Sequence, residues 1–248
     1  MDCWAACLGD CGDKASREHL VSASLFVDDE ILVQGFPWCP EGRKIGLANL
    51  TAKILCERHN NILSPVDEGG AEAFNTLREF NRIEQARQRI RVRITNVIKH
   101  RINGLILERW FLKTLINFSY NGDKPIGRGS QVAGKPSDEL VRIAFGLSHF
   151  RGRAGLSFVV RVGMQIRSQD IFKFAPLIKD GRIEGGLFVF RGQPMLLYLG
   201  EEGVPVPLSG VHVEGEDLGS CLINFHNERI TANRGKHPSQ VIRIDWPK

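Results

Sequence analysis

Thiol and imidazole side chains occur near the start of the chain at spacings that suit a tetrahedral metal ion. Three residues separate Cys7 from Cys11, and two separate Cys56 from His59. Zinc is usually bound by four such ligands, which two parts of a chain supply as close pairs. The spacing therefore predicts a structural Zn2+ site formed by Cys7, Cys11, Cys56 and His59.

Two more cysteines in the same region are alternative ligands. Cys3 precedes Cys7 by the same three-residue gap, and Cys39 lies between the two pairs. The chain has no apolar run of about 18 residues and no signal-peptide start, so we expect a cytoplasmic protein without a membrane span. The cysteines could be small buried hydrophobes. Clustered thiols in a reducing compartment favour a metal instead.

A carboxylate and an imidazole, Glu18 and His19, are adjacent between the two predicted ligand pairs. An imidazole titrates near neutral pH and therefore suits a general base. A carboxylate is a hard oxygen ligand of the kind that Mg2+ prefers. A Glu-His dipeptide is a surface feature in most proteins, and its position between the two pairs is what favours a catalytic role here.

The order of these motifs resembles the zinc-ribbon branch of the HNH nucleases, whose fold is the ββα-metal finger. The resemblance covers about residues 1–70. It is carried by Cys7 and Cys11, by Glu18-His19, by Asn49 in "GLANLTAKILC" and by Cys56-Glu-Arg-His59-Asn60.

The resemblance implies a role for each matching residue. His19 is expected to take a proton from water, so that hydroxide attacks a phosphodiester phosphorus. Glu18 and Asn60 are expected to hold a catalytic Mg2+ or Mn2+ ion. Asn49 is expected to brace the loop beside the base. The zinc ion would hold the hairpin and helix together.

Three departures from the family pattern affect these assignments. His59 stands where the family usually has a cysteine, and Asn60 where it more often has a histidine, which makes the chain an H-N-N variant. The gap between Asn49 and the next cysteine is about two residues longer than usual. Asn61 and Asp67 are therefore alternatives for part of the metal site.

The charge distribution predicts a polyanionic partner for the middle of the chain. The formal net charge is +5 and the pI is about 9.0. Residues 1–70 carry 11 acidic and 6 basic side chains, whereas residues 71–113 carry 4 and 10. Such a basic segment suits phosphate contacts, although a solvated helix face is the alternative. The predicted nucleic-acid contacts are Arg87, Arg89, Arg91 and Arg93.

Helical periodicity dominates the middle of the chain. A helix is expected from near Asn60, with a core-facing stripe at Ala73, Phe74, Leu77, Phe80 and Ile83. Charged and apolar side chains alternate over residues 89–98, as they do along a strand. A continuation of the preceding helix is the competing interpretation. Residues 104–118 predict a buried helix in which Arg109 and Lys113 flank Trp110 and stay solvated. Ser137 is expected to cap a short helix.

Short apolar runs separated by Gly, Pro and Asp follow from about Leu156 and predict strands and hairpins. The expected fold class is α+β. We expect a zinc-stapled ββα-metal nuclease module at 1–75, a basic helical region at 76–150 and a β-rich region at 151–248 that recognises the target or regulates the module.

The predicted function is metal-dependent hydrolysis of phosphodiester bonds in DNA, in a setting such as restriction or phage defence. RNA is the alternative polymer. The first competing hypothesis is a zinc-stapled module that binds nucleic acid without cutting it. The second is a structural or interaction protein in which the zinc-bound N-terminal region only stabilises the fold. A protein partner or a homo-oligomer is possible. The three hypotheses predict different behaviour: the nuclease cuts DNA when Mg2+ is present, the binding module binds DNA without cutting it, and the structural or interaction protein responds to neither DNA nor Mg2+.

Overall fold

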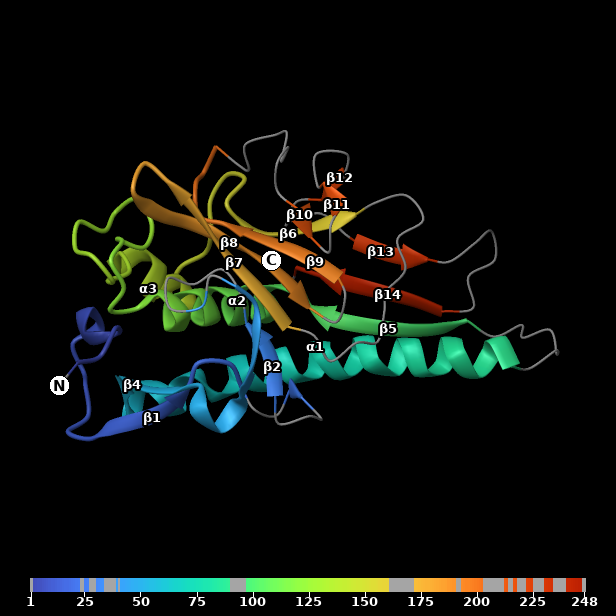
Figure 1. The fold of residues 1–248 in the computed structure, drawn as a ribbon, viewed down its shortest axis with the longest axis horizontal. Helices are drawn as coiled ribbons and strands as arrows, with labels where there is room; N and C mark the ends of the chain where they lie inside the picture. Colours follow the sequence, from blue (N-terminus) through green and yellow to red (C-terminus); the bar gives the residue numbers. More distant parts are fainter. Residues whose placement is uncertain are drawn as a thin grey trace.

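The chain folds into an α+β structure in which strands and helices from distant parts of the sequence pack together (Figure 1). None of the described helices combines the length and the apolar character needed to cross a bilayer. The computed structural model describes residues 2–22, 25–26, 30–33, 39, 41–89, 97–160, 172–190, 193–202, 212–213, 216–217, 222–224, 230–233 and 240–246.

The N-terminal region consists of two antiparallel strand pairs and the beginning of a long helix. β1 pairs with β4, and β2 pairs with β3. β4 continues without a loop into α1, so strand, strand and helix follow in ββα order around the insertion that holds β2 and β3. The elements are η1 (Ala6–Leu8), β1 (Ala15–His19), β2 (Glu30–Val33), β3 (Arg43–Gly46), η3 (Leu47–Asn49), β4 (Thr51–Cys56) and α1 (Glu57–Arg89).

The amphipathic stripe predicted for the first helix is confirmed. α1 begins at Glu57, three residues before the expected start, because it follows β4 directly. Four of the five predicted stripe residues, Ala73, Phe74, Leu77 and Phe80, are buried, and the fifth, Ile83, is half-buried. Gly69 and Gly70 allow a close helix crossing, since a Cβ atom on Gly70 would lie 2.5 Å from Cδ1 of Trp110.

The second predicted helix and its short successor are also confirmed. α2 (Gly104–Ser119) follows β5 (Ile98–Asn103) directly, and the Asn103 side chain caps it by accepting a hydrogen bond from the Ile106 N–H. α3 (Asp138–Ala144) has Ser137 as its N-cap, as expected. Residues 90–96, where strand and helix competed, lie outside the described residues.

The described residues of the C-terminal part form strands, as the apolar runs predicted, and parts of those runs at 161–166, 191–192 and 225–229 lie outside the described residues. A five-stranded antiparallel sheet has the order β12-β6-β9-β8-β7. A three-stranded sheet, β13-β14-β5, joins β14 and β5 in parallel. The bounds are β6 (Gly155–Val160), β7 (Phe172–Lys179), β8 (Arg182–Phe190), β9 (Gln193–Tyr198), β10 (His212–Val213), β11 (Glu216–Asp217), β12 (Leu222–Asn224), β13 (Ile230–Asn233) and β14 (Gln240–Asp245).

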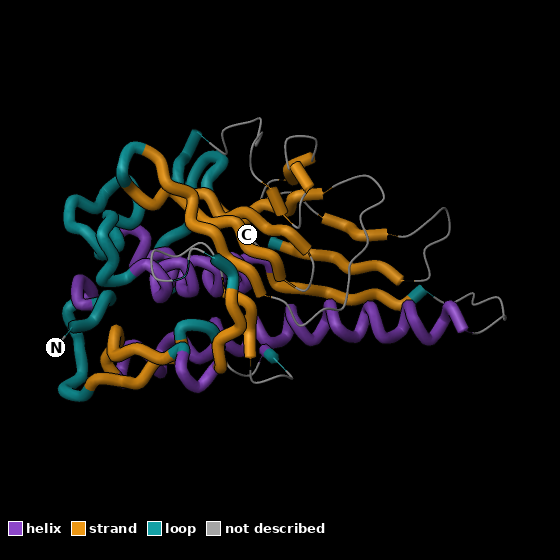
Figure 2. Tube along the Cα trace, in the orientation of Figure 1, coloured by secondary structure: helices purple, strands orange, loops and turns teal. Residues whose placement is uncertain are grey.

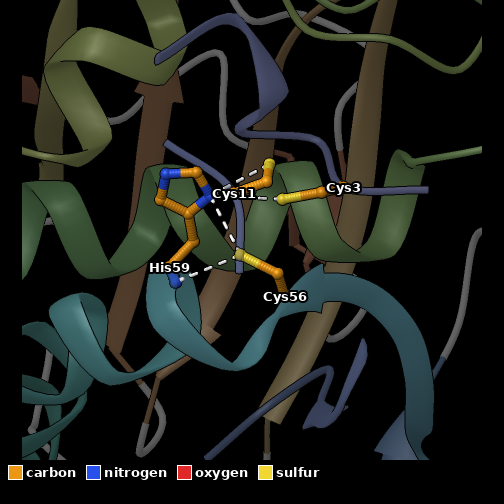
Figure 3. Close-up of side chains that lie close together, drawn as sticks. All are labelled: Cys3, Cys11, Cys56 and His59. Carbon is orange, nitrogen blue, oxygen red and sulfur yellow. Dashed lines mark hydrogen bonds between the residues drawn. The ribbon is translucent and has the colours of Figure 1, made fainter. Parts of the chain in front are cut away.

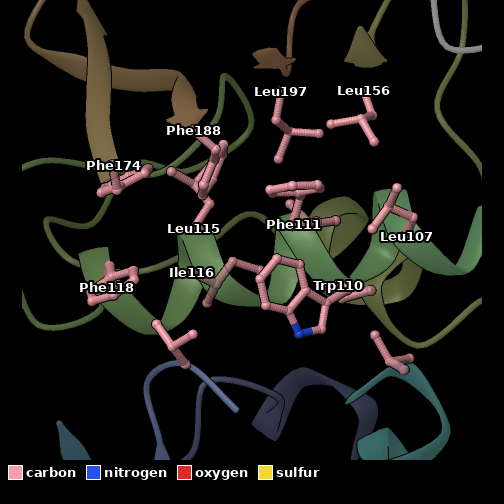
Figure 4. Packing of buried hydrophobic residues seen from close by; sticks show 14 of the residues in the cluster. Leu107, Trp110, Phe111, Leu115, Ile116, Phe118, Leu156, Phe174, Phe188 and Leu197 are labelled. Carbon is pink, nitrogen blue, oxygen red and sulfur yellow. The ribbon is translucent and has the colours of Figure 1, made fainter. Parts of the chain in front are cut away.

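α2 lies between the large sheet and the N-terminal region (Figures 1 and 2). On one side, Phe111 contacts Phe188 of β8 with ring centroids 4.7 Å apart. On the other side, Trp110 points toward α1 (Figure 4). Residues of all three regions expected from the sequence therefore belong to one hydrophobic cluster.

Candidate metal centre

Three cysteines and one histidine meet at the junction of β4 and α1. Cys3, Cys11, Cys56 and His59 each offer one ligand atom, and these atoms lie within 4.8 Å of one another. Their side chains converge on one point (Figure 3). In the described part of the chain, this is the one group of three or more Cys, His, Asp or Glu side chains with such a geometry. These four residues could hold a metal ion such as zinc.

Local backbone structure explains why the four side chains converge. Cys56 ends β4 and His59 lies in the first turn of α1, and the His59 backbone N–H donates to Cys56 Sγ at 3.4 Å, which holds the two residues together at the strand–helix junction. The Trp4 N–H donates to the Ile54 carbonyl at 3.0 Å, which holds the N-terminal segment beside β4. After η1, Gly9 adopts a left-handed conformation at φ 93° and turns the chain back toward the cluster.

The distances from His59 Nδ1 to the three cysteine sulfurs suit a tetrahedral zinc ion. The His59 Nδ1 atom lies 3.4 Å from Cys3 Sγ, 3.7 Å from Cys11 Sγ and 3.2 Å from Cys56 Sγ. Zn–S bonds of about 2.3 Å and Zn–N bonds of about 2.0 Å at tetrahedral angles place sulfur and nitrogen about 3.5 Å apart. The three distances in the structure bracket that separation.

The thiols differ in how readily they ionise. Burial raises the pKa of the Cys3 thiol to about 12. Burial acts in the same direction on Cys56, but the backbone N–H groups of His59 and Gly12 and the neighbouring thiols bring its pKa below the ordinary value. Cys56 therefore ionises more readily than Cys3 and Cys11, whose pKa values are raised, and a bound cation would favour ionisation of all three thiols.

The far side of the His59 ring faces protein groups. Its Nε2 atom lies 3.0 Å from Oδ1 of Asp10, and Oδ2 of Asp10 lies 2.6 Å from the Arg58 guanidinium. The Phe145 ring packs edge-on against the imidazole at 5.4 Å between centroids. The imidazole is fully buried and is held on both sides.

The choice of cysteines differs from the sequence prediction at one position. Cys11, Cys56 and His59 lie in the cluster as predicted, but Cys3 takes the place assigned to Cys7. Cys7 is exposed, and its surroundings include Asp138 at the start of α3. Cys39, the other reserve ligand, is buried and donates to the Glu41 carbonyl. A signal for Cys3 was present in its apolar neighbour Trp4, which marks a buried segment.

Glu18 is placed in an internal ion pair. It is the one buried residue of β1, and its Oε1 atom lies 2.6 Å from Lys113 Nζ. Lys113 is only 2% exposed, and it also lies 2.6 Å from Oδ2 of Asp67. Burial raises the pKa of Glu18, and the Lys113 ammonium opposes that rise. The ammonium group thus occupies the position next to Glu18 that a catalytic cation was expected to take.

The expectation that the charged side chains beside Trp110 are solvated is wrong for Lys113, which is buried. Its ammonium is buried between two carboxylates, and Arg109 is half-buried with its Nε–H donating to the Ala144 carbonyl at 3.0 Å. Sequence spacing gave no sign of this, because the partners of Lys113 lie 46 and 95 positions away along the chain.

The other residues of the predicted catalytic set lie on β1, η3 and α1. His19 is exposed at the end of β1, and its Cα pairs with Thr51. The Asn60 amide donates to the Ser16 hydroxyl at 2.9 Å, which joins α1 to β1. Asn49 is exposed at the end of η3, and the Leu20 N–H donates to the Leu50 carbonyl beside it.

The alternative metal-site residues and the predicted nucleic-acid contacts do not form one group in the described structure. Asn61 is exposed, and Asp67 pairs with Lys113. Arg87 is half-buried and Arg89 is exposed at the C-terminal end of α1. Arg91 and Arg93 lie outside the described residues.

Comparison of the chain with protein-family models, with curated proteins and with solved structures found no match.

Proposed function

We propose that the chain is a metal-dependent nuclease of the HNH type, built on a ββα module that a structural zinc ion holds together. One observation carries the proposal. β1 and β4 form an antiparallel pair that runs directly into α1, and the four candidate ligands lie at that junction. The Asn60–Ser16 bond joins the first turn of α1 to β1, which is the strand that carries His19.

His19 is the general base in this proposal. Its imidazole is exposed, so water and a phosphodiester can reach it. It would accept a proton from the attacking water. Asn60 would offer its amide oxygen to a Mg2+ or Mn2+ ion, since its amide nitrogen already donates to Ser16. The ion would neutralise charge on the phosphate and on the leaving 3′ oxygen. Asn49 would brace the end of β1 through η3.

Glu18 has a different role in the proposal from the one its position in the sequence implied. Successive side chains of a strand point to opposite faces. Because Glu18 is buried against Lys113, the neighbouring His19 faces outward. Glu18 therefore acts as a positioning residue that fixes the orientation of β1.

A second candidate function is a zinc-stapled module that binds nucleic acid without cutting it. The Glu18–Lys113 pair favours this alternative, because an ammonium group already neutralises the carboxylate expected at the catalytic ion. Exposed cations near the end of α1 and on β5, including Arg89, Lys99 and Arg101, would contact phosphates in both proposals.

The test is cleavage of supercoiled plasmid DNA by the purified full chain with Mg2+, Mn2+ or EDTA. His19→Ala removes the base and is expected to lower metal-dependent nicking at least about 100-fold, because general-base catalysis contributes that much or more. His149→Ala is the matched control, since His149 is also an exposed histidine. Its nicking rate should equal that of the unmodified chain.

Equal nicking by His19→Ala and the unmodified chain would remove His19 from the mechanism. DNA binding that weakens with salt, without nicking under either metal, would favour the second candidate. Circular dichroism and zinc content are measured for each variant, so that a folding defect is recognised as such.

A further inference from the structure

We infer that Asp10 is a positioning residue of the metal centre, which holds the His59 ring so that Nδ1 is the ligand atom. The inference rests on the metal site of the proposed function but not on nuclease activity. It concerns a residue that neither the ligand spacing nor the family resemblance singles out.

The hydrogen-bond chemistry of the two side chains fixes the assignment. The Asp10 carboxylate can only accept hydrogen bonds, so at 3.0 Å the Nε2 atom of His59 must carry the proton. In a neutral imidazole, that proton leaves the lone pair on Nδ1. Nδ1 is also the atom that lies 3.2 to 3.7 Å from the three cysteine sulfurs.

Asp10 contacts one of the candidate metal ligands, His59, and is not itself a candidate ligand. Metal-bound histidines usually donate their second N–H to a carboxylate or carbonyl, which fixes both the tautomer and the ring orientation and makes the ligand more basic. Arg58 in turn holds Asp10, with 2.6 Å between Asp10 Oδ2 and the guanidinium. Asp10 directly precedes the ligand Cys11, and Arg58 directly precedes His59. Each partner of this ion pair is therefore adjacent in sequence to one ligand.

The contact also explains the path of the N-terminal segment. Cys3 and Cys11 lie at the two ends of a stretch that contains η1 and the left-handed Gly9. The Asp10 contacts to Arg58 and His59 attach the end of this stretch to the first turn of α1. The Cys11 side chain is thereby brought toward Cys56 without a long loop.

The inference predicts a specific loss of metal affinity. Asp10→Ala should weaken Zn2+ binding about tenfold, at the lower end of the range for outer-shell partners, because the Asp10 side chain is 49% exposed. Asp10→Asn should fall between Asp10→Ala and the unmodified chain, since an amide oxygen still accepts from Nε2. Asp13→Ala is the matched control, because it removes another exposed carboxylate from the same segment and should leave the affinity unchanged.

The measurement is competition of the full chain with a chromophoric chelator for Zn2+, together with 15N NMR of histidine-labelled, zinc-loaded protein. The NMR spectrum should show His59 with metal on Nδ1 and a proton on Nε2. Unchanged Zn2+ affinity in Asp10→Ala, or metal bound through Nε2, would overturn the inference. If Asp10→Ala lost its fold, as circular dichroism would show, the tautomer of the unmodified chain would decide alone.

Discussion

Glu108 is a buried carboxyl group, and among the described residues no cation pairs with it. It is 3% exposed, and its Oε2 atom accepts a hydrogen bond of 2.7 Å from the Leu156 N–H. Burial raises its pKa to about 8, from an ordinary value of 4.5. The folded chain therefore holds a proton that the unfolded chain releases between those two pH values.

The sign of the resulting pH dependence follows from that difference. The protonated Glu108 carboxyl group adds to the free energy of unfolding, and this addition is fully present below about pH 4.5. It is lost as the pH rises toward about 8, and the free energy of unfolding then falls by up to about 1.4 kcal/mol per pH unit. Glu108→Gln should remove this slope and keep the bond to Leu156. Urea denaturation of both proteins from pH 5 to pH 8 measures the difference. Parallel profiles of the free energy of unfolding would contradict the prediction.

At the residue scale, spacing predicted three of the four candidate metal ligands but could not choose correctly among the first three cysteines. The gaps Cys3 to Cys7 and Cys7 to Cys11 are equal. The choice depends on η1 and on the left-handed Gly9, which decide which side chains face Cys56. Asp10 was not predictable, because its contact to His59 exists only after the segment has folded back.

At the scale of elements, Lys113 joins three of them. Its ammonium on α2 contacts Glu18 of β1 and Asp67 of α1 at 2.6 Å each. Lys113→Met keeps the apolar stem and removes the charge, which leaves two carboxylates without their cation. We expect a loss of about 3 kcal/mol in the free energy of unfolding, as for other broken buried ion pairs. Urea denaturation with and without the substitution measures it.

The double variant Lys113→Met/Glu18→Gln is the control for this prediction. It removes the uncompensated charge and should recover part of the lost stability. A Lys113→Met protein within about 0.5 kcal/mol of the original would show that the ion pair does not stabilise the contact between β1 and α2.

Helix periodicity predicted α1 and α2, because an apolar stripe is a local property of the sequence. It could not predict which polar residues of a helix are buried. Lys113 resembles any solvated lysine until Glu18 and Asp67 approach it in the folded chain. The close crossing of the two helices at Gly70 and Trp110 is likewise a property of the packed pair.

At the scale of the whole molecule, the α+β class was predictable from the change of apolar pattern near residue 156, whereas the pairing between regions was not. β5 comes from the predicted helical middle, yet it pairs in parallel with β14 near the C-terminus. The paired residues of the two strands lie about 140 positions apart in the sequence, and parallel strands are not joined by a tight turn, so no local turn motif indicates the pairing. α1 crosses the expected boundary at residue 75, so the ββα module and the middle region share a helix.

The metal centre is the feature on which both proposals depend, and zinc content tests it most directly. Zinc per chain is measured after gel filtration for the unmodified protein, Cys3→Ser and Cys7→Ser. One zinc ion per chain is expected in the unmodified protein and in Cys7→Ser, and little or none in Cys3→Ser, because Cys3 lies in the ligand cluster and Cys7 does not. Full zinc content in Cys3→Ser together with zinc loss in Cys7→Ser would contradict the ligand set.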